Sequence, residues 1–202
     1  MGSVLLPALF GIAMGLRHAF EPDHVTAVAA MVVEQRSARS TLRYATLWGV
    51  GHALVLVVVA AILLALKAEM PERLALAFEV AVAVVLVALG ARALLGRGRA
   101  SVATGPRPLL VGIVHGLAGS GAMTALAIAS SQSAAGALSA VALYALGAVL
   151  GMALLAGAAG PLLSRLSSAP RAGAWIVRLA GVGSVALGLF WGGKSLVALT
   201  QL

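Results

Sequence analysis

Long apolar stretches, separated by short polar or glycine-rich connections, run the whole length of the chain. Six of them are long enough to cross a bilayer as α-helices, each of which needs about 20 residues. They cover residues 3–33, 44–66, 73–95, 109–130, 134–163 and 174–199. The pattern predicts an all-α polytopic membrane protein with six transmembrane helices.

Composition supports the same class of protein. Of the 202 residues, 61% are apolar and only 10% are charged, and the mean hydropathy is +1.06. A soluble domain has about 45–50% apolar and about 25% charged residues. These values exclude a water-soluble enzyme, a disordered tail and a nucleic-acid-binding module, so we expect a lipid bilayer as the surroundings, no nucleic-acid partner and no enzymatic activity.

Cysteine is absent from the chain, which excludes disulfides and thiolate metal ligands. The formal net charge is +8, but the basic residues are scattered singly at the ends of apolar runs and form no patch. The first residues carry no basic region and no small-residue cleavage site, so we expect mature sequence rather than a signal peptide.

Basic residues predict the orientation in the membrane. With six spans, three connections lie on one side, and the opposite connections offer only Lys67 and Arg73, offset by Glu69 and Glu72. The basic connections carry Arg36, Arg39, Arg43, Arg97, Arg99, Arg107, Arg165 and Arg171. Because basic connections stay in the cytoplasm, both termini are predicted to lie outside it.

The two halves of the chain resemble each other. Gly11–Leu16 is matched by Gly112–Leu117, 101 residues later, and Leu89–Gly90 by Leu187–Gly188, 98 residues later. We interpret this as an internal repeat, although Gly/Leu-rich membrane helices also resemble one another by chance. A repeat of three helices has an odd number of crossings, so the second copy would be inverted, as in many secondary transporters.

This interpretation divides the chain into three parts. Residues 1–96 form the first three-helix repeat, residues 97–108 a basic cytoplasmic linker, and residues 109–202 the second three-helix repeat. In such transporters the substrate site lies at the repeat interface near the middle of the membrane.

The densest polar cluster is His18, Glu21, Asp23 and His24, set around Pro22. In a continuous helix His18 and His24 would lie on different faces, about 240° apart around the axis. Pro22 cannot donate to the carbonyl of His18 and disfavours the α-conformation at Glu21, so the first helix is predicted to break there. A break lets the flanking side chains converge on one cation. The alternative is a helix that ends at the membrane surface in an ordinary polar loop.

Other polar residues lie at membrane depth. His52 follows two glycines that let a neighbouring helix approach closely, so it either completes the cluster or only hydrogen-bonds to it. His115, Ser120 and Glu79 are candidate secondary residues of the site, together with Glu21. Ionisable residues at this depth mark a pathway or a site by default. For a single histidine, a neutral ring hydrogen-bonded between helices is an equally good interpretation.

Imidazole with carboxylate ligands suits Ni²⁺ or Co²⁺, and Zn²⁺ is also compatible with this ligand chemistry. We therefore expect a divalent transition metal as a transported substrate and no permanently bound cofactor. The sequence leaves the oligomeric state open, a homo-oligomer included.

Residues 18–24 have the form H-x-x-x-x-D-H, which resembles the signature of the nickel/cobalt transporter (NiCoT, NicO) family. The flanking residues 15–19 and 23–28 also look like that family, and the Gly51–His52 pair resembles its next motif. The chain is most similar to the short bacterial members labelled urease-accessory (UreH-like) nickel permeases.

The resemblance implies secondary transport of Ni²⁺ or Co²⁺ across the bacterial cytoplasmic membrane. It carries over His18, Asp23 and His24 as signature residues and His52 as the second-motif histidine, and together they form the predicted metal site. Uptake is the favoured direction. The alternatives are efflux by the same fold, a non-transporting membrane accessory protein for metalloenzyme maturation, and an exporter of a small anion, for which Arg17 would be the candidate residue.

Overall fold

The computed structural model describes residues 2–32, 37–95, 107–131, 133–167 and 170–202, and within these ranges every regular element is an α-helix. The helices are α1 (Gly2–His18), α2 (Pro22–Val32), α3 (Ala38–Leu66), α4 (Glu72–Leu94), α5 (Arg107–Ser130), α6 (Ala134–Ser167) and α7 (Pro170–Thr200). In the described part of the chain, α3 to α7 are each long and apolar enough to cross a membrane. The chain is therefore a multi-pass helical membrane protein.

The expected first transmembrane helix is two shorter helices. α1 has 17 residues and α2 has 11, so five described helices, rather than six, are individually long enough to span a bilayer. The chain turns tightly between them, because Phe20 N–H donates to Arg17 O and Glu21 N–H donates to His18 O, both at 2.9 Å. Pro22 then begins α2, where a helix needs no N–H from its first residue. The break lies where the sequence predicts it.

Several helix ends differ from the apolar pattern. α3 begins at Ala38, six residues before its apolar run, because the side chain of Ser37 accepts from Ser40 N–H and the side chain of Ser40 accepts from Ser37 N–H. This reciprocal cap satisfies two N–H groups that the helix start would leave free. α6 continues through Pro161 to Ser167, since membrane helices tolerate an internal proline.

The predicted linker lies mostly outside the described residues. Residues 97–106 are not described, and residues 107–108 belong to α5.

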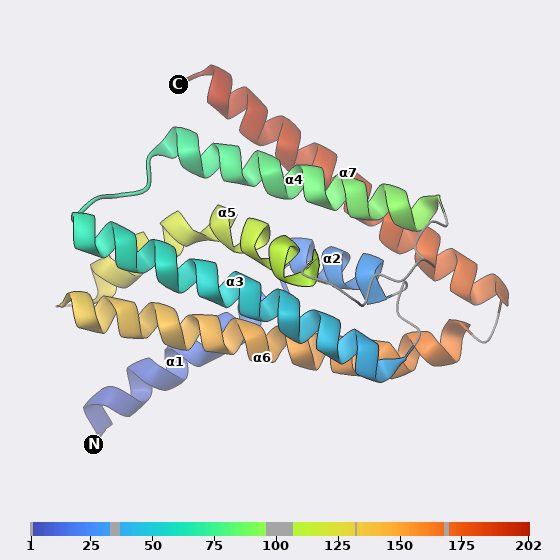
Figure 1. The fold of residues 1–202 in the computed structure, drawn as a ribbon, viewed down its shortest axis with the longest axis horizontal. Helices are drawn as coiled ribbons and strands as arrows, with labels where there is room; N and C mark the ends of the chain where they lie inside the picture. The colour runs from blue at the N-terminus through green and yellow to red at the C-terminus, as the bar shows by residue number, and fades with distance from the viewer. Residues whose placement is uncertain (1, 33–36, 96–106, 132, 168–169) are drawn as a thin grey trace.

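The helices form one bundle in which α3 lies between α5 and α6, α1 packs on α6, and α4 runs along α7 (Figure 1). The short α2 contacts α4, α6 and α7. Both termini and the α3–α4 and α5–α6 connections lie at one end of the bundle, as Figure 1 shows. α3 begins at the other end, so Arg39 and Arg43, in its first two turns, belong to that end.

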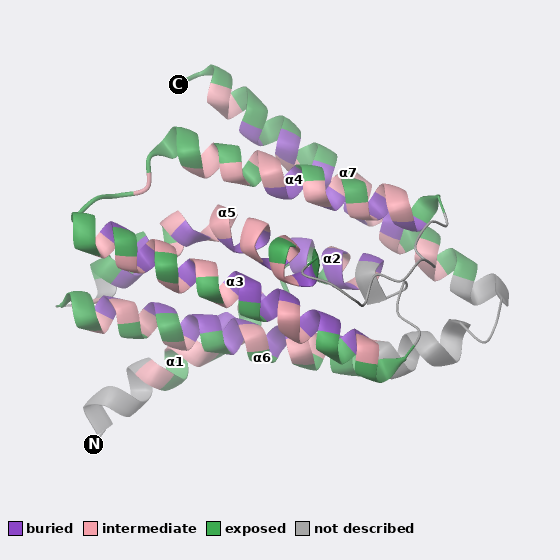
Figure 2. Ribbon diagram, in the orientation of Figure 1, coloured by how far each residue is buried: buried purple, intermediate pink, exposed green. Residues whose placement is uncertain are grey.

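Glycines allow these helices to touch through their backbones. A Cβ atom at Gly112 of α5 would collide with the carbonyl oxygen of Trp48 in α3, and one at Gly15 of α1 would collide with the carbonyl oxygen of Tyr144 in α6. Such close approach is how small residues let membrane helices pack. Figure 2 shows the buried residues on the helix sides that face one another. Large apolar side chains cover the outside, for example Phe10, Leu66 and Phe190, each about two-thirds exposed.

Candidate metal centre

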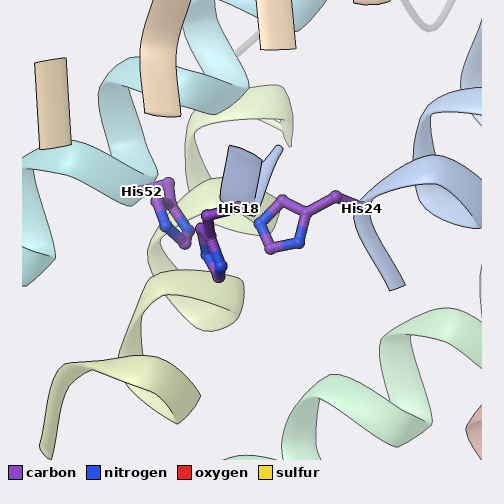
Figure 3. Close-up of side chains that lie close together, drawn as sticks. All are labelled: His18, His24 and His52. Atoms are coloured by element: carbon purple, nitrogen blue, oxygen red, sulfur yellow. The ribbon is translucent and has the colours of Figure 1, made fainter. Parts of the chain in front are cut away.

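Three histidines from three helices meet in the middle of the bundle. His18 ends α1, His24 lies in the first turns of α2, and His52 lies near the middle of α3. Their ring centroids are 4.4 Å apart for His18 and His24, 5.2 Å for His24 and His52, and 5.4 Å for His18 and His52. Figure 3 shows the three rings directed toward one another. One nitrogen from each ring lies within 4.8 Å of the others, which is close enough to hold one metal ion.

The break at Pro22 produces this convergence. His18 and His24 belong to different helices, so the 240° separation of a continuous helix does not apply to them. His52 reaches them because α3 packs against α6, which also contacts α1 and α2.

The ring nitrogens of His24 and His52 are buried and have no hydrogen-bond partner in the described part of the protein. Each of these two residues is only 1% exposed. A buried polar group left unpaired costs about 1–3 kcal/mol, so four such nitrogens in one place need an explanation. A bound cation supplies one, because a metal ion is a partner for imidazole nitrogen.

The carboxylate of Asp23 lies between His24 and His115 of α5. Its Oδ2 accepts a hydrogen bond from His115 Nε2 at 2.9 Å. The same oxygen is 3.1 Å from His24 Nδ1, close enough for a charge contact but without hydrogen-bond geometry. Asp23, His24 and His115 are all buried and form a second group whose ligand atoms lie within 4.8 Å of one another. The structure thus divides the predicted ligands into two groups that share His24.

Glu21 is placed to orient His18. Its Oε2 is 2.9 Å from His18 Nδ1, and its side chain is 51% exposed, against 14% for His18. When Nδ1 carries the proton and donates it to this carboxylate, Nε2 is left free for a metal ion. Carboxylates commonly hold metal-ligating histidines in this way.

Two of the candidate secondary residues have other partners. Ser120 is buried and donates to the carbonyl of Leu117 in its own helix, at 2.7 Å. Glu79 is exposed on α4 and accepts from Ser195 of α7, at 2.7 Å. Glu79 belongs to neither of the two groups of close ligand atoms found among the described residues.

Two aromatic residues, which the search for metal ligands in the sequence does not single out, lie beside the site. Trp48 is fully buried, and its ring centroid lies 5.4 Å from that of His24 and 5.5 Å from that of His115. The ring of Tyr144 lies 5.4 Å from that of His18. The position of Trp48 one helical turn before His52 is a signal that could have placed it at the site.

The two groups together offer imidazole nitrogens from four histidines and one carboxylate, that of Asp23, and no sulfur ligand. Such ligands suit borderline divalent metals, with Ni²⁺, Co²⁺ and Zn²⁺ among them. Irregular backbone at membrane depth occurs only where protein or a water-filled cavity surrounds it. Helix breaks of this kind are typical of ion-binding sites in transporters.

Comparison with known proteins gives a consistent result. The sequence model of the HupE / UreJ protein family matches residues 7–194. A similar protein is the urease accessory protein UreH of Bacillus sp. (strain TB-90), which is 28% identical over 161 residues, or 70% of this chain and 71% of that protein. No solved structure matches the chain significantly.

The similarity to UreH confirms the resemblance to UreH-like proteins that the sequence indicates. The family whose model matches is HupE/UreJ, and not specifically the nickel/cobalt transporter family. Since the family model covers nearly the whole chain, this multi-pass membrane protein belongs to the HupE/UreJ family.

Proposed function

We propose that the protein is a permease that moves Ni²⁺ or Co²⁺ inward across the bacterial cytoplasmic membrane, and that it is not an enzyme. The observation that carries this proposal is the meeting of His18, His24 and His52 at a helix break, with the nitrogens of His24 and His52 buried and unpartnered. Membership of the HupE/UreJ family and similarity to a urease accessory protein support a nickel-related role.

In the proposed mechanism the cation binds among His18, Asp23, His24 and His52, and the two halves of the protein rock to expose it to either side. α1 and α2 together make a sixth crossing, and both termini lie outside the cytoplasm. Arg39 and Arg43 lie at the start of α3, at the end of the bundle opposite to both termini, which supports this orientation.

We further propose that the halves are inverted repeats, residues 1–96 and 109–202, joined by residues 97–108. Helix contacts support this division. Gly15 of α1 lies against a backbone carbonyl of α6, and in the same way Gly112 of α5 lies against a backbone carbonyl of α3. Between α4 and α7, Gly90 lies against Gly181, and the corresponding contact is that of Gly188 with Ala83.

These contacts favour a register different from the one in the sequence motif. They pair Gly15 with Gly112, 97 residues apart, instead of Gly11 with Gly112. The shift arises because helix contacts depend on which glycine faces the partner, whereas Gly/Leu-rich segments match in more than one alignment.

Uptake of ⁶³Ni²⁺ by liposomes that contain only the purified protein tests the proposal. We expect metal-dependent uptake that His24→Ala abolishes while the variant still folds and inserts. Ser184→Ala is the matched control, because Ser184 is buried and donates to Leu86 O rather than to any of the histidines. Wild-type uptake in His24→Ala would contradict the proposed site.

The same experiment separates the alternatives. Binding by calorimetry without uptake would favour an accessory role, which the name of the Bacillus relative also suggests. Neither binding nor uptake would favour the small-anion exporter. Outward movement of the metal under an imposed gradient would favour efflux.

A further inference from the structure

We propose that the protein holds its cation at two adjacent positions that share His24, and that the ion passes from one to the other. Position one is formed by His18, His24 and His52. Position two is formed by Asp23, His24 and His115. This inference rests on the transport function proposed above and specifies the path within its site.

Position two has the features expected of a metal-binding site. All three side chains are buried, with Asp23 7%, His24 1% and His115 3% exposed. Asp23 Oδ1 and His115 Nδ1 have no hydrogen-bond partner in the described part of the chain, although the other oxygen and nitrogen of this pair bond to each other. A buried carboxylate and two imidazoles form a mixed oxygen and nitrogen site suited to a divalent transition metal.

His24 can serve either position but not both at once. Its Nδ1 lies 3.1 Å from Asp23 Oδ2, on the side of position two. Figure 3 shows the same ring directed at His18 and His52, which places its other nitrogen on the side of position one. A neutral imidazole has one nitrogen without a proton, so it binds one metal ion at a time. The two positions therefore fill in turn, and a chain holds one ion.

Exposure orders the two positions along a path. Position one contains the least buried of the ligand residues, His18, whose side chain is 14% exposed and lies next to the half-exposed Glu21. All three residues of position two are buried, so it is the deeper position. The carboxylate of Asp23 belongs to the deeper position, where a divalent cation has lost most of its water and an opposite charge stabilises it most.

The helix contacts also relate the two positions. His18 follows Gly15 by three residues, and His115 follows Gly112 by three residues. Because the two glycines make equivalent contacts with α6 and α3, His18 and His115 take equivalent places in the two halves. Each position thus includes one histidine from such a pair, so a rocking motion exposes one position or the other.

The competing interpretation is that His115 only positions Asp23. In that case its N–H holds the carboxylate toward a single ion, as outer partners of metal ligands often do. Glutamine separates the two roles, because its amide still donates to Asp23 but is a poor metal ligand.

Purified protein loaded with Co²⁺ tests the proposal, since X-ray absorption and visible spectra report the number of imidazole ligands. We expect one Co²⁺ per chain in the wild type. His115→Gln should hold Co²⁺ with three imidazoles and lose at least about tenfold in ⁶³Ni²⁺ flux. The double variant His18→Gln, His52→Gln should hold Co²⁺ with two imidazoles and a carboxylate. Size-exclusion chromatography checks that each variant is folded.

Three results would overturn the two-position path while leaving the transport function intact. They are wild-type flux and spectra in His115→Gln, no Co²⁺ in the folded double variant, and two Co²⁺ per wild-type chain at saturation. The last needs no variant. Absence of both binding and flux in the wild type would instead overturn the proposed function itself.

Discussion

At the scale of single residues, His52 gives a direct test of the site because α3 contributes no other imidazole to it. Both of its ring nitrogens lack a partner in the described structure, so the side chain makes no hydrogen bond that would hold helices together there. His52→Ala should therefore reduce ⁶³Ni²⁺ uptake into liposomes by more than about tenfold. Thr124→Ala is the control, since Thr124 is buried and bonds only to Ser120 O in its own helix. Equal loss in both variants would contradict a specific role for His52.

Glu21 should show a weaker effect than the histidine it orients. Glu21→Gln keeps an acceptor for His18 Nδ1 but removes the negative charge 2.9 Å away. Outer partners of metal ligands change affinity by about 10–100-fold when they are removed, so we expect this milder change to raise the Kd for Ni²⁺ by about tenfold or less. Calorimetry on the purified variant measures it. An unchanged Kd would show that the exposed carboxylate does not assist His18.

At the scale of helices, backbone contact between α1 and α6 should control stability. A methyl group at Gly15 would collide with the carbonyl of Tyr144, whereas one at Gly119 of α5 would meet no atom within 4 Å. Gly15→Ala should cost about 1–3 kcal/mol through overpacking and lower the Tm in detergent. Gly119→Ala should leave the Tm unchanged or raise it slightly, because alanine favours a helix. A Gly15→Ala protein as stable as the wild type would contradict this contact.

The helix scale also shows what the sequence could predict and what it could not. Pro22 alone located the break, because its effect on the chain is local. The apolar pattern does not predict the early start of α3, because it begins only near Tyr44, whereas the helix begins at the Ser37–Ser40 cap. The pairing of Asp23 with His115 could not be predicted, because it depends on how α2 and α5, 92 residues apart at this contact, are placed in the bundle.

At the scale of the whole molecule, the orientation in the membrane can be tested directly because the chain has no cysteine. Arg39→Cys and Glu69→Cys each place one exposed thiol at opposite ends of the bundle. In intact cells, a membrane-impermeant maleimide should label only the cysteine at position 69. Permeabilised cells should show labelling of both variants. The reverse pattern in intact cells would place both termini in the cytoplasm.

The unpartnered nitrogens of His24 and His52 have a consequence for the life of the protein in the cell. Whenever no cation is bound, the centre of the bundle contains polar atoms that nothing satisfies, and α1, α2 and α3 lose a common attachment point. A ligand that binds only the folded form stabilises it by mass action, by about 2.7 kcal/mol at a hundredfold excess over Kd. A shortage of the transported metal would thus destabilise the folded protein and favour its proteolysis. Its abundance in the membrane would then follow the supply of metal.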